Sequence, residues 1–172
     1  MLIAFAKGAI RDWRDDDLDR LVQLGDNRKI WRNLRDRFPS PYTRADGEAW
    51  IRQNASASPR TAFAIEAEGR LAGSIGLILG TDIHARSAEV GYWLGEPYWR
   101  RGIATGALQA FVPWCFREFD LVRIWAAVFE DNVASARVLE KAGFEREARL
   151  RRSAFKDGRV QDEWLYARLR ES

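Results

Sequence analysis

The spacing of apolar and polar residues divides the chain into helical and extended stretches. Between residues 15 and 51 apolar positions recur every three or four residues, which predicts helices, whereas from residue 60 onward apolar runs bounded by turn residues predict strands. The expected elements in chain order are a strand at 9–12, a helix from 15 that closes at Gly25 or Asn27, helices at 29–37 and from Thr43 onward, strands at 61–67, 71–79 and 88–94, a helix at 102–119, a strand at 122–129, a helix at 132–142, and strands at 147–155 and 160–169.

Turn residues fix several of these boundaries. Glu68-Gly69-Arg70 and Asp157-Gly158 each separate two apolar runs and predict tight hairpins. Gly143 provides a left-handed cap for the helix before it, and Pro113 is expected to kink or interrupt the helix that contains it. Hairpins at both ends with crossover helices between them favour an α/β (α+β) fold, a mixed sheet with helices on both faces.

Composition narrows the class of protein. The 172 residues are 47% hydrophobic and 12% aromatic, which suits one globular domain covering residues 1–172. No apolar run approaches the roughly eighteen residues of a membrane span, and the first residues lack the pattern of a secretory signal. The single cysteine, Cys115, excludes an internal disulfide. We therefore expect a cytoplasmic protein that does not bind membranes.

The charge pattern and the rarity of histidine exclude further classes. The net charge is only +3, and acidic residues alternate with the arginines. The arginine groups at 32–37 and 149–152 could contact nucleic acid, but a solvated surface of mixed charge is the favoured interpretation, so no nucleic-acid partner is expected. With one histidine and one cysteine, neither a Cys/His nucleophile pair nor a histidine-rich metal site is expected.

Residues 88–105 are the most informative stretch of the chain. They predict a buried strand, a turn that carries Arg100 and Arg101, and a helix that opens on Gly102. The first turn of that helix directs free backbone N–H groups and a positive dipole end at one place, which suits a pyrophosphate. An ordinary helix start is the alternative. If the strand also diverges from its neighbour, its unpaired backbone groups can bind an extended amide such as the pantetheine arm of CoA.

A second element, Asn132-Val133-Ala134-Ser135, offers a candidate for the chemistry. Asn132 is a natural helix cap, and plain capping is one interpretation of the segment. In the other, Asn132 and Ser135 face a crevice in which the Ser135 hydroxyl donates a hydrogen bond to the sulfur of a leaving thiolate. Together with the loop, this favours an acyl-CoA-dependent transferase.

Three segments, AEVGYWLGEPYWRRGIAT, VFEDNVASARVLEKAGF and KDGRVQDEWLYA, resemble the GNAT superfamily of N-acetyltransferases. The chain is most similar to the branch that contains the ribosomal-protein alanine and serine N-terminal acetyltransferases, and the resemblance extends from Ile10 to Leu169. It implies a GNAT fold with a sheet of six or seven strands, split near residues 88–95 and 122–129. It also implies transfer of an acetyl group from acetyl-CoA to a primary amine by direct attack in a ternary complex.

The resemblance also implies which residues act. The loop would hold the pyrophosphate, the strand would pair with pantetheine, Asn132 would contact the cofactor arm, and Ser135 would protonate the thiolate. The implied cofactor-binding residues are Tyr92, Trp93, Leu94, Trp99, Arg100, Arg101, Gly102, Ile103, Ala104, Thr105, Asn132 and Ser135. Two positions depart from the family pattern. Trp99 stands where Gln or Arg is frequent, so only backbone contacts carry over there, and Leu139 replaces a frequent tyrosine acid, which leaves that role to Ser135 or water.

The general base has no direct counterpart in the resemblance. The base of the ribosomal-protein enzymes aligns near Ala154, which cannot accept a proton. Glu89 is the preferred substitute, acting directly or through a water, and a structural carboxylate paired with an arginine is the alternative. His84 lies in an expected loop, where a surface role is favoured over that of a base. The expected catalytic residues are therefore Ser135 and Glu89.

The acceptor side is expected to come from the N-terminal helices. Trp31, Phe38, Tyr42 and Trp50 could line an amine pocket, with packing in the core as the alternative. The acceptor could be a protein N-terminal α-amine, whose pKa near 8 leaves part of it neutral, or a small amine such as a polyamine, amino acid or antibiotic. A non-catalytic CoA-binding module is a further alternative. A monomer or a homodimer is expected.

Overall fold

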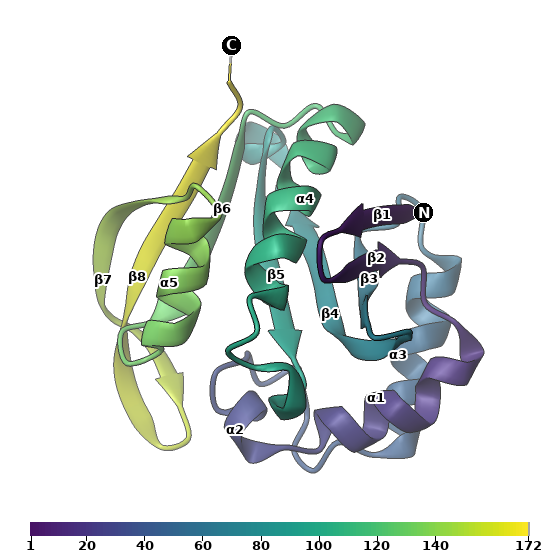
Figure 1. Cartoon of the computed structure of the whole chain (residues 1–172). Coiled ribbons are helices and arrows are strands. Elements are labelled where there is room, and N and C mark those ends of the chain that lie inside the picture. Colours follow the sequence, from purple (N-terminus) through teal and green to yellow (C-terminus); the bar gives the residue numbers. More distant parts are fainter. Residues whose placement is uncertain (172) are drawn as a thin grey trace.

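The computed structural model describes residues 1–171, which form one mixed sheet with helices on both faces (Figure 1). The elements in chain order are β1 Leu2–Phe5, β2 Gly8–Arg11, η1 Asp15–Asp17, α1 Leu18–Gly25, α2 Arg28–Trp31, α3 Arg44–Ser56, β3 Ala62–Ala67, β4 Arg70–Leu79, η2 Asp82–His84, β5 Ser87–Leu94, η3 Glu96–Tyr98, α4 Ile103–Glu118, β6 Arg123–Phe129, α5 Val133–Lys141, β7 Glu145–Lys156 and β8 Arg159–Leu169. The order and type of elements follow the expected pattern closely.

The sheet has eight strands in the order β1-β2-β3-β4-β5-β6-β8-β7. The expected number of six or seven is too low because the prediction contains no strand before residue 9. Residues 2–5 form β1, which pairs antiparallel with β2. Its four residues, Leu-Ile-Ala-Phe, are a short apolar run that alternates between exposed and half-buried positions, and so short a run does not by itself distinguish a strand from another apolar segment.

Two buried clusters lie on opposite faces of the sheet. The smaller one lies under α1 and α3 and includes Leu21, Ile51 and Leu71. The larger one lies under α4 and α5 and includes Phe111 and Leu139. Side chains of a strand alternate between the two faces, so one strand such as β4 contributes to both clusters. The helices therefore cover both faces, as expected.

Two predicted helices differ from those observed. Only Arg28–Trp31 is helical in the stretch predicted at 29–37, and turns follow it up to Pro39 and Pro41, which cannot continue a helix. Helix α4 continues past Pro113 to Glu118, so this proline does not interrupt it. No helix within residues 1–171 is long and apolar enough to cross a membrane.

The sheet splits between β5 and β6, which are the only parallel neighbours among the strands of residues 1–171. They pair through three positions only: Ser87 with Arg123, Ala88 with Ile124, and Glu89 with Trp125. Beyond Glu89, β5 continues along β4 alone, and the rest of β6 pairs with β8 alone. The split expected near residues 88–95 and 122–129 is therefore present.

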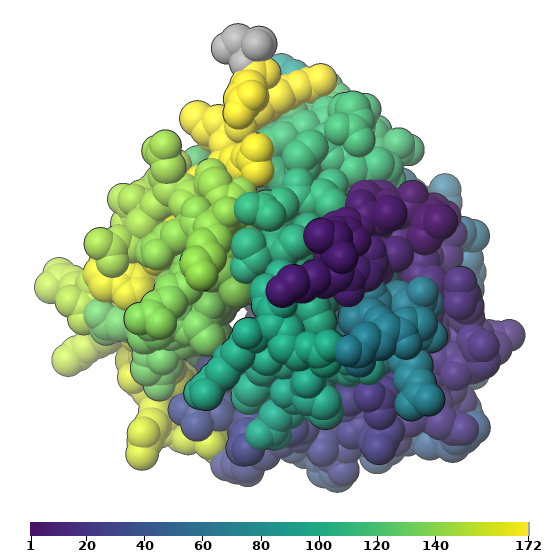
Figure 2. All heavy atoms as spheres, in the orientation of Figure 1, coloured from purple at the N-terminus to yellow at the C-terminus, as the bar shows by residue number. Residues whose placement is uncertain are grey.

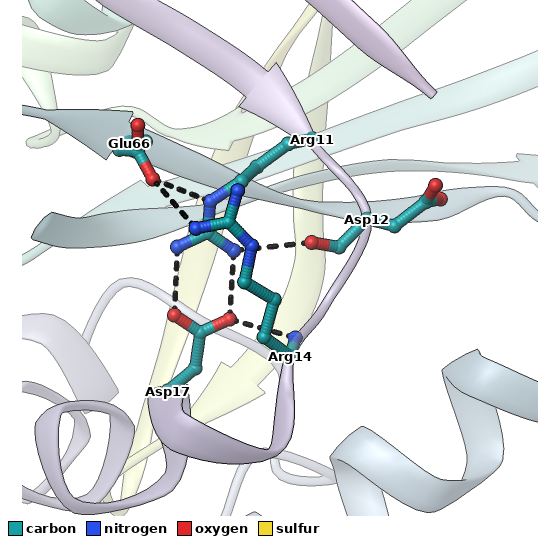
Figure 3. A network of polar contacts seen from close by, with 5 residues as sticks. All are labelled: Arg11, Asp12, Arg14, Asp17 and Glu66. Carbon is teal, nitrogen blue, oxygen red and sulfur yellow. Dashed lines mark hydrogen bonds and ion pairs between the residues drawn. The ribbon is translucent and has the colours of Figure 1, made fainter. Parts of the chain in front are cut away.

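A buried ionic network fastens the first helical segment to the sheet (Figure 3). Arg11 on β2 donates two hydrogen bonds to Asp17, at 2.8 and 2.7 Å, and one to Glu66 on β3 at 2.6 Å. Asp17 also accepts a hydrogen bond from the backbone N–H of Arg14. Arg11 and Asp17 are each only 4% exposed, so each charge depends on the other for compensation.

Candidate active site

The loop before α4 leaves a row of backbone donors unused. Arg100 and Gly102 both have positive φ, +60° and +75°, which turns the chain sharply into the helix. The first backbone bond of the helix runs from the N–H of Gly106 to the carbonyl of Gly102, at 3.0 Å. Within residues 1–171, none of the N–H groups of residues 100–105 has an acceptor. The loop therefore has the free N–H groups and the positive helix end that suit an anion.

The side chains around this loop modify its charge. Arg100 is exposed and has no carboxylate partner in the described part of the chain, whereas Arg101 forms an ion pair with Glu68. Lys7, in the turn between β1 and β2, donates to the carbonyl of Arg101 and brings a further cation to the loop. Figure 2 shows this purple hairpin lying against the green α4. Sequence reasoning missed Lys7, because nothing local relates residues so far apart in the chain.

Strand β5 presents its side chains to two different environments. Tyr92 joins the cluster under α4 and α5, whereas Trp93 contacts Phe38 on the opposite face, with ring centroids 5.5 Å apart. Leu94 is buried, and its carbonyl accepts a hydrogen bond from the indole N–H of Trp99 at 2.7 Å. Trp99 thus anchors the loop to the end of the strand.

A hydroxyl pair spans from β5 to the start of α5. The Tyr92 and Ser135 hydroxyl oxygens lie 2.8 Å apart, and the Tyr92 hydroxyl also donates to the Ser135 carbonyl at 3.2 Å. The side chain of Asn132 accepts from the backbone N–H of Ser135 at 3.2 Å, so Asn132 does cap the helix. Burial raises the pKa of Tyr92 above its usual range, so the phenol stays protonated at neutral pH. The Tyr92 hydroxyl was not among the expected acids, because the resemblance implied only a backbone contact there.

Glu89 lies at the last paired position before the split. Arg35 donates to both of its carboxylate oxygens at 2.6 Å, so the expected pairing with an arginine is also present. The Glu89 side chain is only 15% exposed, and burial raises its pKa while Arg35 and, more weakly, Arg37 lower it. Glu163 on β8 adds a further small upward shift. The net shift is upward, which brings the carboxylate closer to the range useful for a base.

The four aromatic residues expected on the acceptor side do not form one pocket. Phe38 and Tyr42 pack together with centroids 4.8 Å apart, but Tyr42 is 5% exposed, and burial raises its pKa to about 12. Trp50 packs against Trp13 in the core. Trp31 lies apart from them under the buried ammonium of Lys156, which is 3.7 Å from the ring centre. Phe38 is the one that contacts β5.

A cleft of about 930 Å³, here called the hairpin cleft, adjoins this region. Its walls are the α2 segment at 28–33, the connection from β6 to α5 at 130–131, and the β7–β8 hairpin with its flanks. In Figure 2 the dark blue residues of the α2 segment lie beside the yellow β7–β8 hairpin. An ion pair of 2.7 Å between Arg28 and Asp157 joins the segment to the hairpin. Sequence reasoning did not include the hairpin in the acceptor side.

His84 lies in the short turn η2 and is exposed, and among residues 1–171 it forms no hydrogen bond or ion pair with the site residues described above. The structure therefore gathers the expected site residues into three groups. The loop at 99–105 stands at the start of α4, Asn132 and Ser135 with Tyr92 stand at the start of α5, and Glu89 stands on the opposite face with Arg35.

Comparison with known proteins assigns the family. Residues 9–145, well over half of the chain, match the model of the acetyltransferase (GNAT) domain. The protein belongs to the GNAT family.

Individual relatives agree with this assignment. The chain is 38% identical over 97 residues to the uncharacterised N-acetyltransferase YoaA of Bacillus subtilis. The matched stretch covers 56% of this chain and 54% of the relative. It is 34% identical over 87 residues to the ribosomal-protein-serine acetyltransferase of Escherichia coli, covering 51% and 49%. The chain thus spans about half the length of these curated relatives. The solved structure of Mycobacterium smegmatis RimJ in complex with CoA-disulfide is 26% identical and matches with a TM-score of 0.84, covering 98% of this chain and 86% of that one.

Proposed function

We propose that this protein transfers an acetyl group from acetyl-CoA to a primary amine. The observation that carries the proposal comes from residues 1–171: the row of N–H groups at 100–105 without acceptors lies at the end of a strand whose edge toward β6 has no strand partner beyond Glu89. A pyrophosphate followed by an extended amide chain needs these two features side by side.

The donor would be held mainly by backbone groups. The N–H groups of the loop 99–105 would bind the pyrophosphate, with Arg100 and Lys7 adding positive charge. The open edge of Tyr92–Leu94 would pair with the pantetheine amides, and Asn132 would contact the same arm from the start of α5. RimJ, a structural relative, has been solved with a CoA-disulfide, which supports this use of the fold.

The reaction would be a direct transfer in a ternary complex. The neutral amine nitrogen attacks the thioester carbonyl carbon, so that a C–N bond forms and the C–S bond breaks. Glu89 accepts the proton that the amine loses, directly or through a water, and Ser135 donates its hydroxyl proton to the departing thiolate. Tyr92 contacts the Ser135 oxygen and can restore that proton.

A protein N-terminal α-amine is the acceptor we favour. Its pKa near 8 leaves a fraction neutral at pH 7, so a carboxylate base of modestly raised pKa suffices, whereas a lysine near 10.4 demands more. The similarity to a ribosomal-protein-serine acetyltransferase points the same way. A small amine acceptor and a CoA-binding module without turnover are the competing functions.

A thiol-release assay with a panel of peptides and small amines tests the proposal. We expect turnover with at least one amine, and we expect kcat to fall about 100-fold in Ser135→Ala, the low end for loss of a general acid. Tyr92→Phe should lower kcat less, while acetyl-CoA affinity measured by calorimetry stays near wild type in both. Ser56→Ala, at the exposed end of α3, is the matched control. Tight acetyl-CoA binding without turnover on any amine would favour the binding module.

A further inference from the structure

The charges of the hairpin cleft divide into paired and unpaired groups. Arg149 binds Glu130 at 2.8 Å and Asp162 at 3.1 Å, and Arg28 binds Asp157. These contacts use three of the acidic groups in the cleft wall. A ligand entering the cleft therefore meets those carboxylates already neutralised by arginine.

Two further cations of the wall are neutralised from outside it. Lys29 pairs with Glu96, and Lys156, whose side chain is only 3% exposed, binds Asp36 at 2.6 Å. Neither ammonium group is then available to attract a ligand strongly.

What remains is an excess of arginine. Arg32 and Arg159 line the cleft, both are exposed, and neither has a carboxylate partner in the part of the chain that the structure describes. Asp131 is the one acidic residue of the wall without a cationic partner among residues 1–171. Among the described residues of the cleft wall, two guanidinium groups and one carboxylate are therefore unpaired, which leaves an excess of positive charge.

Two segments of the chain run from the cleft wall to residues of the candidate active site. Asp131 directly precedes Asn132, which caps the helix that carries Ser135. On the other wall, Arg32 in the turns after α2 lines the cleft. Arg35, three residues later in the same turns, binds Glu89. A chain whose amine lies at Glu89 can therefore extend along the same segment into the cleft.

We propose that the hairpin cleft binds the acceptor beyond its reacting amine and selects peptides with acidic residues close to the N-terminus. This inference rests on the proposed acetyl transfer. A guanidinium presents parallel N–H donors that match a carboxylate, so Arg32 and Arg159 suit acidic side chains. The same two charges repel a polyamine, which the cleft would disfavour as an acceptor.

Steady-state kinetics with matched peptides test this selection. Peptides identical except for Asp, Asn or Lys at positions 2 to 5 are compared with spermidine. We expect kcat/KM to be about tenfold higher for the Asp peptide than for the Lys peptide, the effect of one charge-assisted contact, and the preference to weaken as salt increases. The double variant Arg32→Glu/Arg159→Glu should reverse the order. Arg52→Glu/Arg117→Glu makes the same charge change at exposed sites outside the cleft wall and should keep it.

A direct binding measurement separates this inference from the proposed function. Fluorescence anisotropy with a labelled Asp peptide, in the presence of CoA, should show binding that the Arg32→Glu/Arg159→Glu variant loses and the control variant keeps. Turnover with equal kcat/KM for the Asp, Asn and Lys peptides would overturn the inference and leave acetyl transfer intact. Peptide binding through the two arginines without turnover would overturn acetyl transfer instead. An RNA oligonucleotide that binds more tightly than the peptide through the same residues would also overturn the inference.

Discussion

At the scale of residues, the alternation of β5 separates the proposed acid from the proposed base. Glu89 and Tyr92 are three positions apart, so their side chains lie on opposite faces of the sheet. Glu89 meets Arg35 from the N-terminal segment, and Tyr92 meets Ser135 at the start of α5. A reacting carbonyl held at the edge of this strand would be approached by base and acid from opposite sides.

The pair between Arg35 and Glu89 should set the lower limit of the pH range in which the base can accept a proton. A general base works only when deprotonated, so activity falls as the pH drops through its pKa. Arg35 lowers the pKa of Glu89, and burial raises it. Removing the guanidinium in Arg35→Ala should raise this pKa further and move the acidic limb of the kcat/KM profile to higher pH. The measurement is kcat/KM against pH with one peptide, divided at each pH by the fraction of its α-amine that is neutral, because that amine titrates near pH 8.

Two variants control this experiment. Arg35→Lys keeps a positive charge beside Glu89 and should return the acidic limb part of the way toward its wild-type pH. Arg52→Ala removes an exposed arginine elsewhere and should leave the limb at its wild-type pH. An acidic limb at the same pH in Arg35→Ala and wild type would remove Glu89 from the role of base.

Within the candidate site, contacts between neighbours in the sequence could be predicted, and contacts between distant residues could not. The hydrogen bond from the Ser135 N–H to the Asn132 side chain lies within one helix turn. It is the helix cap that the local sequence indicates. The contacts of Tyr92 with Ser135 and of Arg35 with Glu89 join residues 43 and 54 positions apart, and no local pattern encodes them. Arg35 belongs to an arginine-rich run that is also compatible with a plain solvated surface.

At the scale of elements, strong local signals predicted structure well and weak ones did not. Strands β3 and β4, with the tight turn between them, follow from long apolar runs, and α5 follows from its two caps. Strand β1 was missed because its apolar run has only four residues, and its pairing with β2, which makes it a strand, is a contact that the run itself does not reveal. The stretch at 29–37 has helical spacing, but the prolines after it shorten the helix.

The network that joins β2, η1 and β3 should contribute strongly to stability. Arg11→Met leaves the carboxylate of Asp17 buried without compensation, and we expect the free energy of unfolding to fall by about 3–5 kcal/mol. Urea unfolding measures the change. Arg11→Met/Asp17→Asn should recover part of the loss because it leaves no buried charge there.

An exposed ion pair provides the matched control for this network. Arg44 binds Asp19 at 2.6 Å, but their side chains are 62% and 85% exposed. Arg44→Met should therefore lower the free energy of unfolding far less than Arg11→Met does, because solvent screens an exposed ion pair. Equal losses in the two methionine variants would show that burial of the Arg11 network carries no special energetic weight.

At the scale of the whole molecule, the split divides the sheet into two parts. Strands β1–β5 form one and β6–β8 the other, and three residue pairs of β5 with β6 join their backbones. Helix α4 helps to connect them, since it packs on β1, β2 and β5 as well as on α5. A ligand that occupies the split would contact both parts and stabilise the folded protein as a unit.

Thermal unfolding tests this idea. Acetyl-CoA at 100 times its Kd should stabilise the protein by about 2.7 kcal/mol and raise the Tm accordingly. At equal concentration, 3′-phosphoadenosine 5′-diphosphate, which has the pyrophosphate but no pantetheine arm, should give a smaller shift, because it leaves the edge of β5 unpaired. Equal shifts for the two compounds would argue against pantetheine binding along the strand.

Strand β7 gives the molecule protection against unwanted association. It ends the sheet, and a terminal strand can act as a template for another copy of the chain. Its exposed positions carry many charged side chains, among them Arg146, Arg151 and Arg152, and its pairing with β8 shifts register twice. Like charges would face each other if two such edges met, and an irregular edge offers no continuous ladder. The charges and the irregular register of this edge thus disfavour pairing of two copies of the chain along β7.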